Sequence, residues 1–515
     1  MNFNSAQFYW FALPVLAVTL MLALLVGRGE SSIWPANCVH NWEQYGFSAL
    51  HGKLVSNPGG FETLEKPDIY KGHRAASFYP VFAVGQLLNR LGDTLLMFHL
   101  VFTVALFFSV WHLLGRSGLA AAGAAIASLC PGYTIYPTVI DPNAVALYMV
   151  VPFGAIMVRS LAAKKLAAWH IALLTLLTFA YTSLNWSTAF GHGILFCALL
   201  ALPAVPWTRV GLYLVMAGVS VGIVGALSVL DKMGGGHGSA GAGGGSFLTF
   251  LAGYTWGHCG YGADLTTLKA IVRLTAVNTL GLLPLLTFLG WLTWKIRQAD
   301  GRWDALVFLP LAAAMSGVLL MRNYFGHHPW MAAPMLLPGM IMTLCLLIRR
   351  NPVEISGGKK ISTGFAFLII SLGYALVVLG AHRAYHSEPL ELSSLVLHHT
   401  TRTDIIVLVT NLDPQMAAQA EPLSETTDRR VIVLPDLKTP PAVVGNLFVL
   451  SATDLSAQLT ATAHSEKPAL LSLPLVHELS AWYAAHISRR GAQDKHFTYT
   501  TGATFGLYRL PVEIH

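Results

Sequence analysis

The sequence predicts a polytopic α-helical membrane protein, with about eleven transmembrane helices followed by a soluble α/β domain. Three observations support this fold class. Only 11% of the 515 residues are charged, whereas soluble domains average about 25%. Apolar runs long enough to cross a bilayer recur through roughly the first 380 residues. Farther along, the apolar runs shorten to strand length and alternate with helix-like stretches. We therefore divide the chain into a transmembrane module, 1–382, and a second domain, 383–515.

The apolar runs define the expected spans. The run 8–26 is interpreted as a retained helix, because it lacks the basic residues and the cleavage site of a signal peptide. The other expected spans are 94–114, 117–132, 143–160, 166–184, 186–203, 207–229, 270–294, 304–321, 330–348 and 361–381. The stretch 77–91 is apolar but short, so we expect it to lie at the membrane interface rather than to cross.

The basic residues predict the orientation. With a cytoplasmic N-terminus, five consecutive inner loops carry Lys or Arg, as the positive-inside rule requires. These residues are Arg116, Arg159, Lys164, Lys165, Arg209, Lys295, Arg297, Arg302, Arg349, Arg350, Lys359 and Lys360. We expect an integral protein of a bacterial-type inner membrane, with the second domain extracytoplasmic. Because these loops contain much of the basic excess behind the net charge of +7, membrane lipids are expected partners and nucleic acid is not.

The second domain is predicted to be α/β. Strand-like runs occupy 404–412, 429–437, 445–455 and 504–511. Helix-like stretches lie at 455–464 and 475–488. The domain contains no GxGxxG, GxxxxGK[ST] or GxSxG motif, so the sequence gives no support for nucleotide binding or hydrolysis there. A role in capping the substrate or in fitting a partner is the remaining expectation.

The first outer loop, 27–93, is polar and rich in His, Glu, Asp and Lys. Another outer loop contains GGGHGSAGAGGGS (234–246), which suits either a spacer or a mobile loop that orders over substrate. Cys38 and Cys259 both fall in outer loops, and a disulfide between them stays open. The sequence has no CxxC or paired Cys/His spacing that would indicate a zinc site.

Two acidic residues are the candidate catalytic groups. Glu43 stands among aromatic residues early in the first loop, where partial desolvation could tune a carboxylate as a general base. The alternative is a solvated loop residue. Asp141 stands in IDPN at the outer mouth of a helix, where an acid near hydrocarbon tends to be functional. It also suits a helix N-cap before Pro142. His40 and Tyr45 could contact the acceptor.

Basic side chains on the same face could bind a phosphate group. Candidate donors are Lys71 and Arg74 in the first loop, and Arg322 and His327 in the loop 322–329. The alternative is anchoring of the helix ends at the membrane interface. Two further histidines could support the acceptor; they are His73 and His328. No metal is assigned, and a divalent cation stays open because the spacing of Asp, Glu and His selects none.

Three stretches of the chain carry a family resemblance. They are NWEQYGFSALHGKLV (41–55), EKPDIYKG (65–72) and LCPGYTIYPTVIDPNAVALY (129–148). With the expected architecture, they resemble the GT-C superfamily of membrane glycosyltransferases, in the branch of protein O-mannosyltransferases and lipid A aminoarabinose transferases. The resemblance covers the architecture of roughly the first 380 residues. It implies a GT-C-like helical module, an acidic residue in each of the first two outer loops and a soluble outer domain.

The resemblance also implies an activity. A sugar would pass from a polyprenyl-phosphate donor to an acceptor on the extracytoplasmic face with inversion, and Glu43 and Asp141 would match the two loop acids. Many relatives carry an Asp-Glu pair at the first site, where this sequence has a single acid. An alignment anchored on Gly52 would place Asn37 or His40 there instead. Two alternatives remain, a non-catalytic GT-C-like subunit of a membrane complex and a lipid or solute transporter. The sequence assigns no protein partner.

Overall fold

The computed structural model describes residues 33–57, 59, 69, 75–88, 105, 109, 118–134, 142–233, 265–300, 304–321, 332–350, 366–379, 387–417, 420–438, 446–464 and 505–510. The chain forms two compact units. The first, the helical unit, comprises Met1–Leu25 and Lys71–Leu379. The second, the sheet unit, comprises Val26–Tyr70 and Gly380–His515. The sheet unit thus includes part of the first loop, which the division at residue 382 assigned to the transmembrane module.

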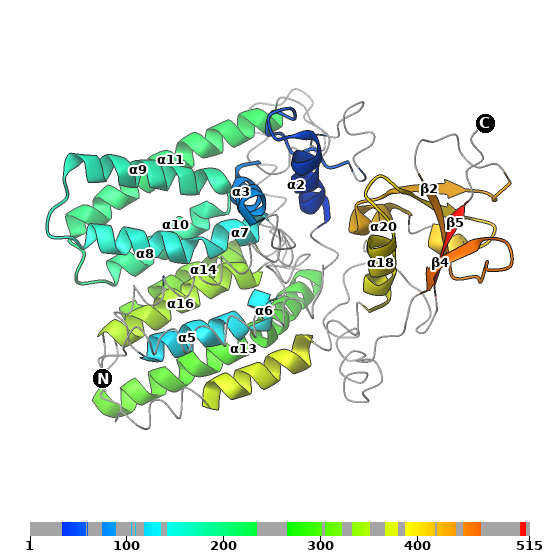
Figure 1. The fold of residues 1–515 in the computed structure, drawn as a ribbon. Coiled ribbons are helices and arrows are strands. Elements are labelled where there is room, and N and C mark those ends of the chain that lie inside the picture. Colours follow the sequence, from blue (N-terminus) through cyan, green and yellow to red (C-terminus); the bar gives the residue numbers. More distant parts are fainter. Residues whose placement is uncertain are drawn as a thin grey trace. The chain divides into compact units, whose positions relative to one another are not determined.

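The described part of the helical unit is built from helices that run side by side (Figure 1). Its short early elements are η2 (Ala75–Ser77) and α3 (Tyr79–Leu88). The helices that follow are α5 (Gly118–Leu129), α6 (Pro131–Thr134), α7 (Pro142–Tyr148), α8 (Val150–Leu161), α9 (Ala168–Leu184), α10 (Thr188–Leu200), α11 (Trp207–Met233), α13 (Leu265–Asp300), η3 (Ala305–Phe308), α14 (Leu309–Leu320), α16 (Ala332–Arg350) and a last helix, Ala366–Leu379.

Three described helices are long and apolar enough to cross a membrane, at Trp207–Ser228, Asn278–Gln298 and Ala332–Arg350. Shorter apolar helices occupy several other expected spans: Val145–Leu161, Ala168–Leu184, Thr188–Leu200, Ala305–Leu320 and Ala366–Leu379. The described residues therefore show far fewer full-length spans than eleven. The expected span 8–26 lies outside them, and only residues 105 and 109 of 94–114 are described.

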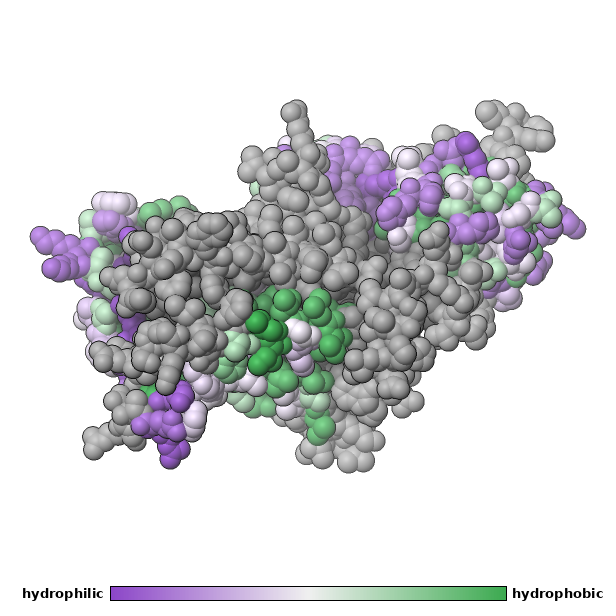
Figure 2. Space-filling view, turned by 60° about the horizontal axis from the view of Figure 1, so that its bottom comes forward, coloured by the Kyte–Doolittle hydropathy of each residue, from purple (hydrophilic) through white to green (hydrophobic). Residues whose placement is uncertain are grey.

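The burial of these helices distinguishes the centre of the helical unit from its outside. In the apolar segment of α16, which packs against α14, α13 and α10, 83% of the residues are buried. In the corresponding segment of α11, only 33% of the residues are buried. Large apolar side chains are exposed along α9 and α11, among them Leu173, Leu176, Val215 and Val219. Figure 2 shows exposed apolar residues gathered on one face of the helical unit. Such a surface suits lipid rather than water.

Small residues let α14 and α16 approach closely. A Cβ atom added to Gly339 would lie 2.7 Å from the Cβ of Ala314 and 2.8 Å from the carbonyl oxygen of Pro310. On the other helix, a Cβ atom added to Gly317 would lie 2.7 Å from the sulfur of Met335. Close approach at small residues is the usual way in which apolar helices gain packing energy inside a membrane.

The sheet unit contains a five-stranded mixed sheet in the order β2-β1-β3-β5-β4. Strand β1 (Ile405–Val409) pairs in parallel with β2 (Arg430–Leu434) and β3 (Leu447–Ser451). Strand β5 (Gly506–Leu510) runs antiparallel to β3 and to β4 (Thr460–His464). The helices are α18 (Ser387–His399), α19 (Pro414–Ala417) and α20 (Ala420–Thr427).

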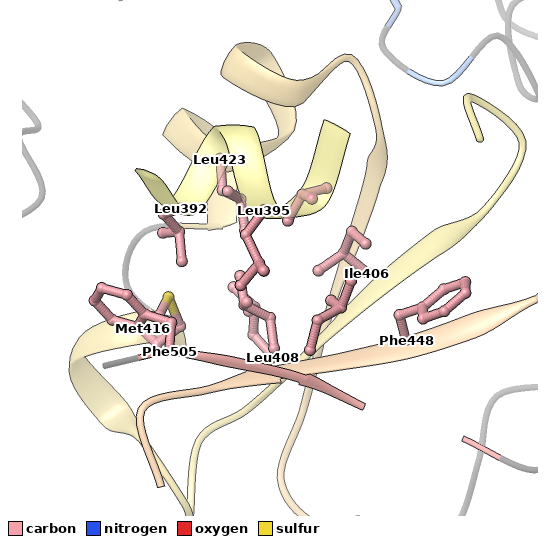
Figure 3. Close-up of a cluster of buried hydrophobic side chains, with 11 residues drawn as sticks. Leu392, Leu395, Ile406, Leu408, Met416, Leu423, Phe448 and Phe505 are labelled. Atoms are coloured by element: carbon pink, nitrogen blue, oxygen red, sulfur yellow. The ribbon is translucent and has the colours of Figure 1, made fainter. Parts of the chain in front are cut away.

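The central strands β1 and β3 are buried on both faces, whereas β2 is half-buried and β4 is largely exposed. Ile406 and Leu408 point to one face, where Leu392 and Leu395 of α18 and Leu423 of α20 meet them (Figure 3). The alternate residues of β1 belong to the opposite cluster, with Leu455 and Tyr508 among others. A strand buried on both faces reads as a continuous apolar run, which explains the sequence IIVLV.

The four strands expected in this domain are confirmed, since the observed strands β1, β2, β3 and β5 lie inside the predicted runs. The helix-like reading of 455–464 is wrong, because Thr460–His464 forms β4. Pairing with β5, across an irregularity between Ala461 and Ala463, outweighs the helix propensity of the two alanines. The expected helix 475–488 lies outside the described residues.

Candidate functional site

The first loop folds into a helix, α2 (Ile33–Tyr45), held by its own following turn. The indole of Trp42 is almost fully buried, and its Nε1 donates to the carbonyl oxygen of Lys53 at 2.7 Å. The ring also meets Phe47 edge-on, with centroids 5.2 Å apart. Gly46 ends the helix with φ +91°, and its N–H donates to the carbonyl of Trp42. A left-handed residue at this position is the usual helix terminator.

The opposite side of α2 presents a row of polar side chains. Asn37, His40, Asn41 and Gln44 follow the i, i+3, i+4, i+7 spacing and so share one face. The amide of Asn41 is buried and donates to the carbonyl oxygens of Val55 at 2.8 Å and Asn57 at 3.1 Å. Asn37 donates to the Ser56 carbonyl at 3.5 Å. These bonds fix the strand-like return of the loop beside the helix.

Arg402 connects this face to the start of the sheet. Its Nη2 donates to Asn41 Oδ1 at 2.6 Å, and its Nη1 donates to Gln44 Oε1. The same guanidinium binds the carboxylate of Asp428, with Nε 2.7 Å from Oδ2 and Nη2 3.3 Å from Oδ1. Both side chains are mostly buried, at 17% and 6% exposure. A bidentate ion pair between two mostly buried side chains has the geometry that makes an Arg–carboxylate contact strong.

Asp428 is the centre of the cluster. His40 Nδ1 donates to its Oδ2 at 2.8 Å, and the backbone N–H of Gly59 donates to its Oδ1 at 3.1 Å. Gly59 has φ +71°, and a Cβ atom there would lie 2.9 Å from the backbone nitrogen of Arg430. We call His40, Asn41, Gln44, Gly59, Arg402 and Asp428 the Asp428 network.

The electrostatics of the network hold Asp428 ionised. Burial alone would raise the pKa of Asp428, but the hydrogen bond from His40 and the charge of Arg402 outweigh burial and lower that pKa below its usual range. At Tyr45 burial prevails instead: partial burial raises the pKa of the hydroxyl, and the charge of Arg402 only partly offsets this rise. A carboxylate so fully engaged is suited to holding α2 in place, not to accepting a proton at neutral pH.

Glu43 lies off the face that the Asp428 network occupies. It is three positions from His40 but falls outside the row of Asn37, His40, Asn41 and Gln44, and its side chain is half-exposed. Tyr45, at the C-terminal end of the same helix, is also half-exposed. The structure therefore brings three predicted residues, His40, Glu43 and Tyr45, onto one anchored helix. It engages His40 in the network rather than leaving it for a ligand.

The other predicted site residues lie outside the described residues. They are Lys71, His73, Arg74, Asp141, Arg322, His327 and His328. Cys38 is buried, and Cys259, with which a disulfide was left open, lies outside the described part. Among the residues that the structure describes, no group of three or more His, Cys, Asp or Glu side chains is arranged to hold a metal ion.

Sequence reasoning missed Arg402 and Asp428, although a signal was present. Arg402 precedes β1 by three residues and Asp428 precedes β2 by two. Because β1 and β2 are neighbouring parallel strands, residues that precede them meet at the same edge of the sheet. Nothing local, however, indicates that a helix from the first loop completes the cluster.

A second polar cluster is buried in the helical unit. His192 on α10 bonds to the Thr182 hydroxyl through Nε2 at 2.8 Å and to the Tyr213 hydroxyl through Nδ1 at 2.7 Å. Both ring nitrogens are therefore engaged by neighbouring helices. This arrangement is typical of a satisfied core histidine.

Comparison of the sequence with protein-family models and with curated proteins finds no match.

Proposed function

We propose that this protein is a membrane-embedded glycosyltransferase of GT-C type that moves a sugar from a polyprenyl-phosphate donor to an acceptor on the extracytoplasmic face. The single observation that carries the proposal is the anchoring of α2 by the Asp428 network, which leaves Glu43 half-exposed on another face of the same helix. An apolar helical unit in the same chain supplies the setting that a lipid-linked donor requires.

The topology supports this proposal. Helix α2 and the strands belong to one compact unit, so both lie on the same side of any membrane that the chain crosses. An even number of crossings must then separate Tyr70 from Gly380. Ten of the eleven proposed spans lie between these residues, which meets the requirement. With a cytoplasmic N-terminus, the sheet unit and Glu43 are both extracytoplasmic.

Glu43 acts as the general base in this mechanism. Its carboxylate takes the proton of the acceptor hydroxyl as the oxygen attacks the anomeric carbon. The bond from that carbon to the donor phosphate breaks on the opposite side, so the centre inverts and polyprenyl phosphate leaves with the electron pair. Asp141 orients the acceptor or binds a cation. The leaving phosphate is neutralised by basic residues from the set Lys71, Arg74, Arg322 and His327.

Positioning is the main contribution of the described residues. Asn41, Gln44 and Arg402 fix the rotation of α2 about its axis, and the Trp42 bond to Lys53 fixes its opposite side. A fixed helix holds the Glu43 backbone in one place, which reduces the entropy lost when base and acceptor meet. Phosphate is already a good leaving group, so positioning and charge stabilisation can supply most of the rate.

A non-catalytic subunit of a membrane complex is the second candidate, and one observation favours it. His40, Asn41, Arg402 and Asp428 bond to one another, so their side chains dock α2 within the sheet unit. The transporter alternative receives less support, because the buried His192 is fully engaged by Thr182 and Tyr213.

The deciding experiment replaces Glu43 with Gln in the full chain. Membranes containing the protein are supplied with a panel of radiolabelled polyprenyl-phosphate hexoses, and the release of polyprenyl phosphate and the labelled product are measured. We expect transfer by the wild type and at least a 100-fold lower rate for Glu43→Gln, as befits loss of a general base. Asp436→Asn, a change at a half-exposed carboxylate elsewhere in the sheet unit, should keep full activity. Full activity of folded Glu43→Gln, or no transfer by the wild type from any donor, excludes this function.

A further inference from the structure

The helical unit contains a pocket at the end where its basic residues gather. The pocket has a volume of about 690 Å³ and is lined by Leu202, Pro203 and Ala204 after α10, by Asp304 before η3, and by Arg349 and Arg350 in the last turn of α16. Figure 2 shows hydrophilic residues at the end of this unit drawn on the left. None of the residues that line the pocket is assigned to sugar transfer.

The charges in the pocket do not cancel. Asp304 accepts a hydrogen bond from the Leu306 N–H at 2.9 Å through Oδ1, and its Oδ2 pairs with Arg350 Nη1. The acid is therefore neutralised within the protein. Arg349 is exposed, and no hydrogen bond or ion pair to it is found among the described residues. The guanidinium of Arg349 is thus the uncompensated positive charge in the pocket lining, and it is suited to binding an anion.

Arg350 adds an independent observation. Its Nε is buried and has no acceptor in the part of the chain that the structure describes. Buried donors are nearly always paired, so this arginine, which lines the pocket, retains unused hydrogen-bonding capacity. The positive-inside rule and the dipole of α16 both explain why arginines end this helix, but neither accounts for a pocket or for the orphaned donor.

The surroundings of the pocket indicate a lipid as the source of the anion. A narrow apolar crevice lined by α8, α10 and α16 residues, including Met342 and Leu346, shares Leu202 and Arg349 with the pocket. Along α16, the residues that line these two spaces therefore change from apolar, at Met342 and Leu346, to cationic, at Arg349 and Arg350. Arg209, which lies at the same end, already donates to the carbonyls that close α8 and so is not part of this site.

We propose that this pocket binds the phosphate headgroup of an anionic phospholipid, with Arg349 and Arg350 as the donors. The glycerol lies beside Leu202 and Pro203 at the apolar side of the pocket, while the chains remain in the bilayer. Basic pockets between membrane helices hold anionic headgroups by the same combination of charge and adjoining hydrocarbon. The bound lipid would join the ends of α10, η3 and α16.

The test uses the full chain in nanodiscs of phosphatidylcholine into which phosphatidylglycerol is titrated, with the thermal midpoint and the retained lipid as readouts. Wild type should show a saturable rise in the midpoint and retain phosphatidylglycerol. Arg349→Gln should bind about tenfold more weakly. The matched control is Arg297→Gln, at an exposed arginine in the last turn of α13 that does not line the pocket.

A second variant tests the site independently, in case Arg349→Gln fails to fold. Ala204 is exposed and lines the pocket, so Ala204→Glu should fold normally and repel the headgroup. Loss of phosphatidylglycerol binding in Arg349→Gln and Ala204→Glu, but not in Arg297→Gln, supports the site. Unchanged binding in folded Arg349→Gln or Ala204→Glu overturns it, as does equal loss in Arg297→Gln. An equal midpoint rise from inorganic phosphate or glycerol 3-phosphate without lipid overturns the lipid assignment.

Discussion

Replacing Asp428 with Asn should release α2 from the sheet unit. Asp428 accepts bonds from His40, from two nitrogens of Arg402 and from the Gly59 backbone, and its side chain is only 6% exposed. Asn keeps the size of the side chain and tolerates the left-handed φ of +50° found here, so the change removes mainly the charge.

The magnitude follows from the burial of the pair. Removing one partner of a buried ion pair costs about 3–5 kcal/mol, because the remaining charge is left uncompensated. Arg402 is 17% exposed and keeps its bonds to Asn41 and Gln44, so we expect a smaller cost, about 2–3 kcal/mol. That free energy corresponds to about 30- to 160-fold faster exchange of the α2 amides, if exchange proceeds through local opening.

The assay is hydrogen exchange with mass spectrometry on the full-length protein, following the peptide that covers Ile33–Tyr45. Asp454→Asn is the control, since Asp454 belongs to the same unit but contacts only Ser456 and Tyr508 among the bonds described for its carboxylate. It should leave the exchange of α2 unchanged. Exchange of α2 within twofold of wild type in Asp428→Asn would show that Asp428 does not hold this helix.

Two further outcomes follow from the same network. Because the folded-state pKa of Asp428 lies below its unfolded value, its contribution is complete above the unfolded pKa and disappears as the pH falls through the folded one. Protection of α2 should therefore be level near neutral pH and decline only below about pH 4, and a decline centred near pH 6 would contradict this assignment. Gly59→Ala should destabilise α2 docking more than Gly46→Ala, in the same exchange assay. Both glycines have positive φ, but only at Gly59 does the new methyl group meet backbone, at Arg430; equal effects would refute the steric argument.

The sequence predicted the sheet better than the helix that docks on it. Runs such as IIVLV and LFVLS are mostly apolar, too short for a span and buried along their whole length, so burial on both faces leaves a local signature. Strand β4 was missed because TATAH carries no apolar pattern, and its structure comes from pairing with β5. Tertiary pairing of this kind overrides local propensity.

The candidate site was only partly predictable for a related reason. The segment around His40 and Glu43 was recognisable as polar and aromatic, but its helix depends on partners far along the chain. Asn41 donates to carbonyls 14 and 16 residues away, and His40 meets Asp428 at a separation of 388 residues. Pairings over such distances leave no periodic trace in a single sequence. Arg297, Arg349 and Arg350 lie in the last turns of α13 and α16, and such helix ends are easier to predict because a basic residue directly follows each apolar run.

The central proposal is that Glu43 is the general base for transfer from a lipid-linked donor on the extracytoplasmic face. A cryo-EM map of the full chain in nanodiscs, with a polyprenyl phosphate added, tests it most directly. We expect phosphate density beside basic residues of the set Lys71, Arg74, Arg322 and His327, with the carboxylates of Glu43 and Asp141 lining the same pocket. Density for the phosphate elsewhere, or Glu43 and Asp141 on opposite sides of the membrane, would contradict it.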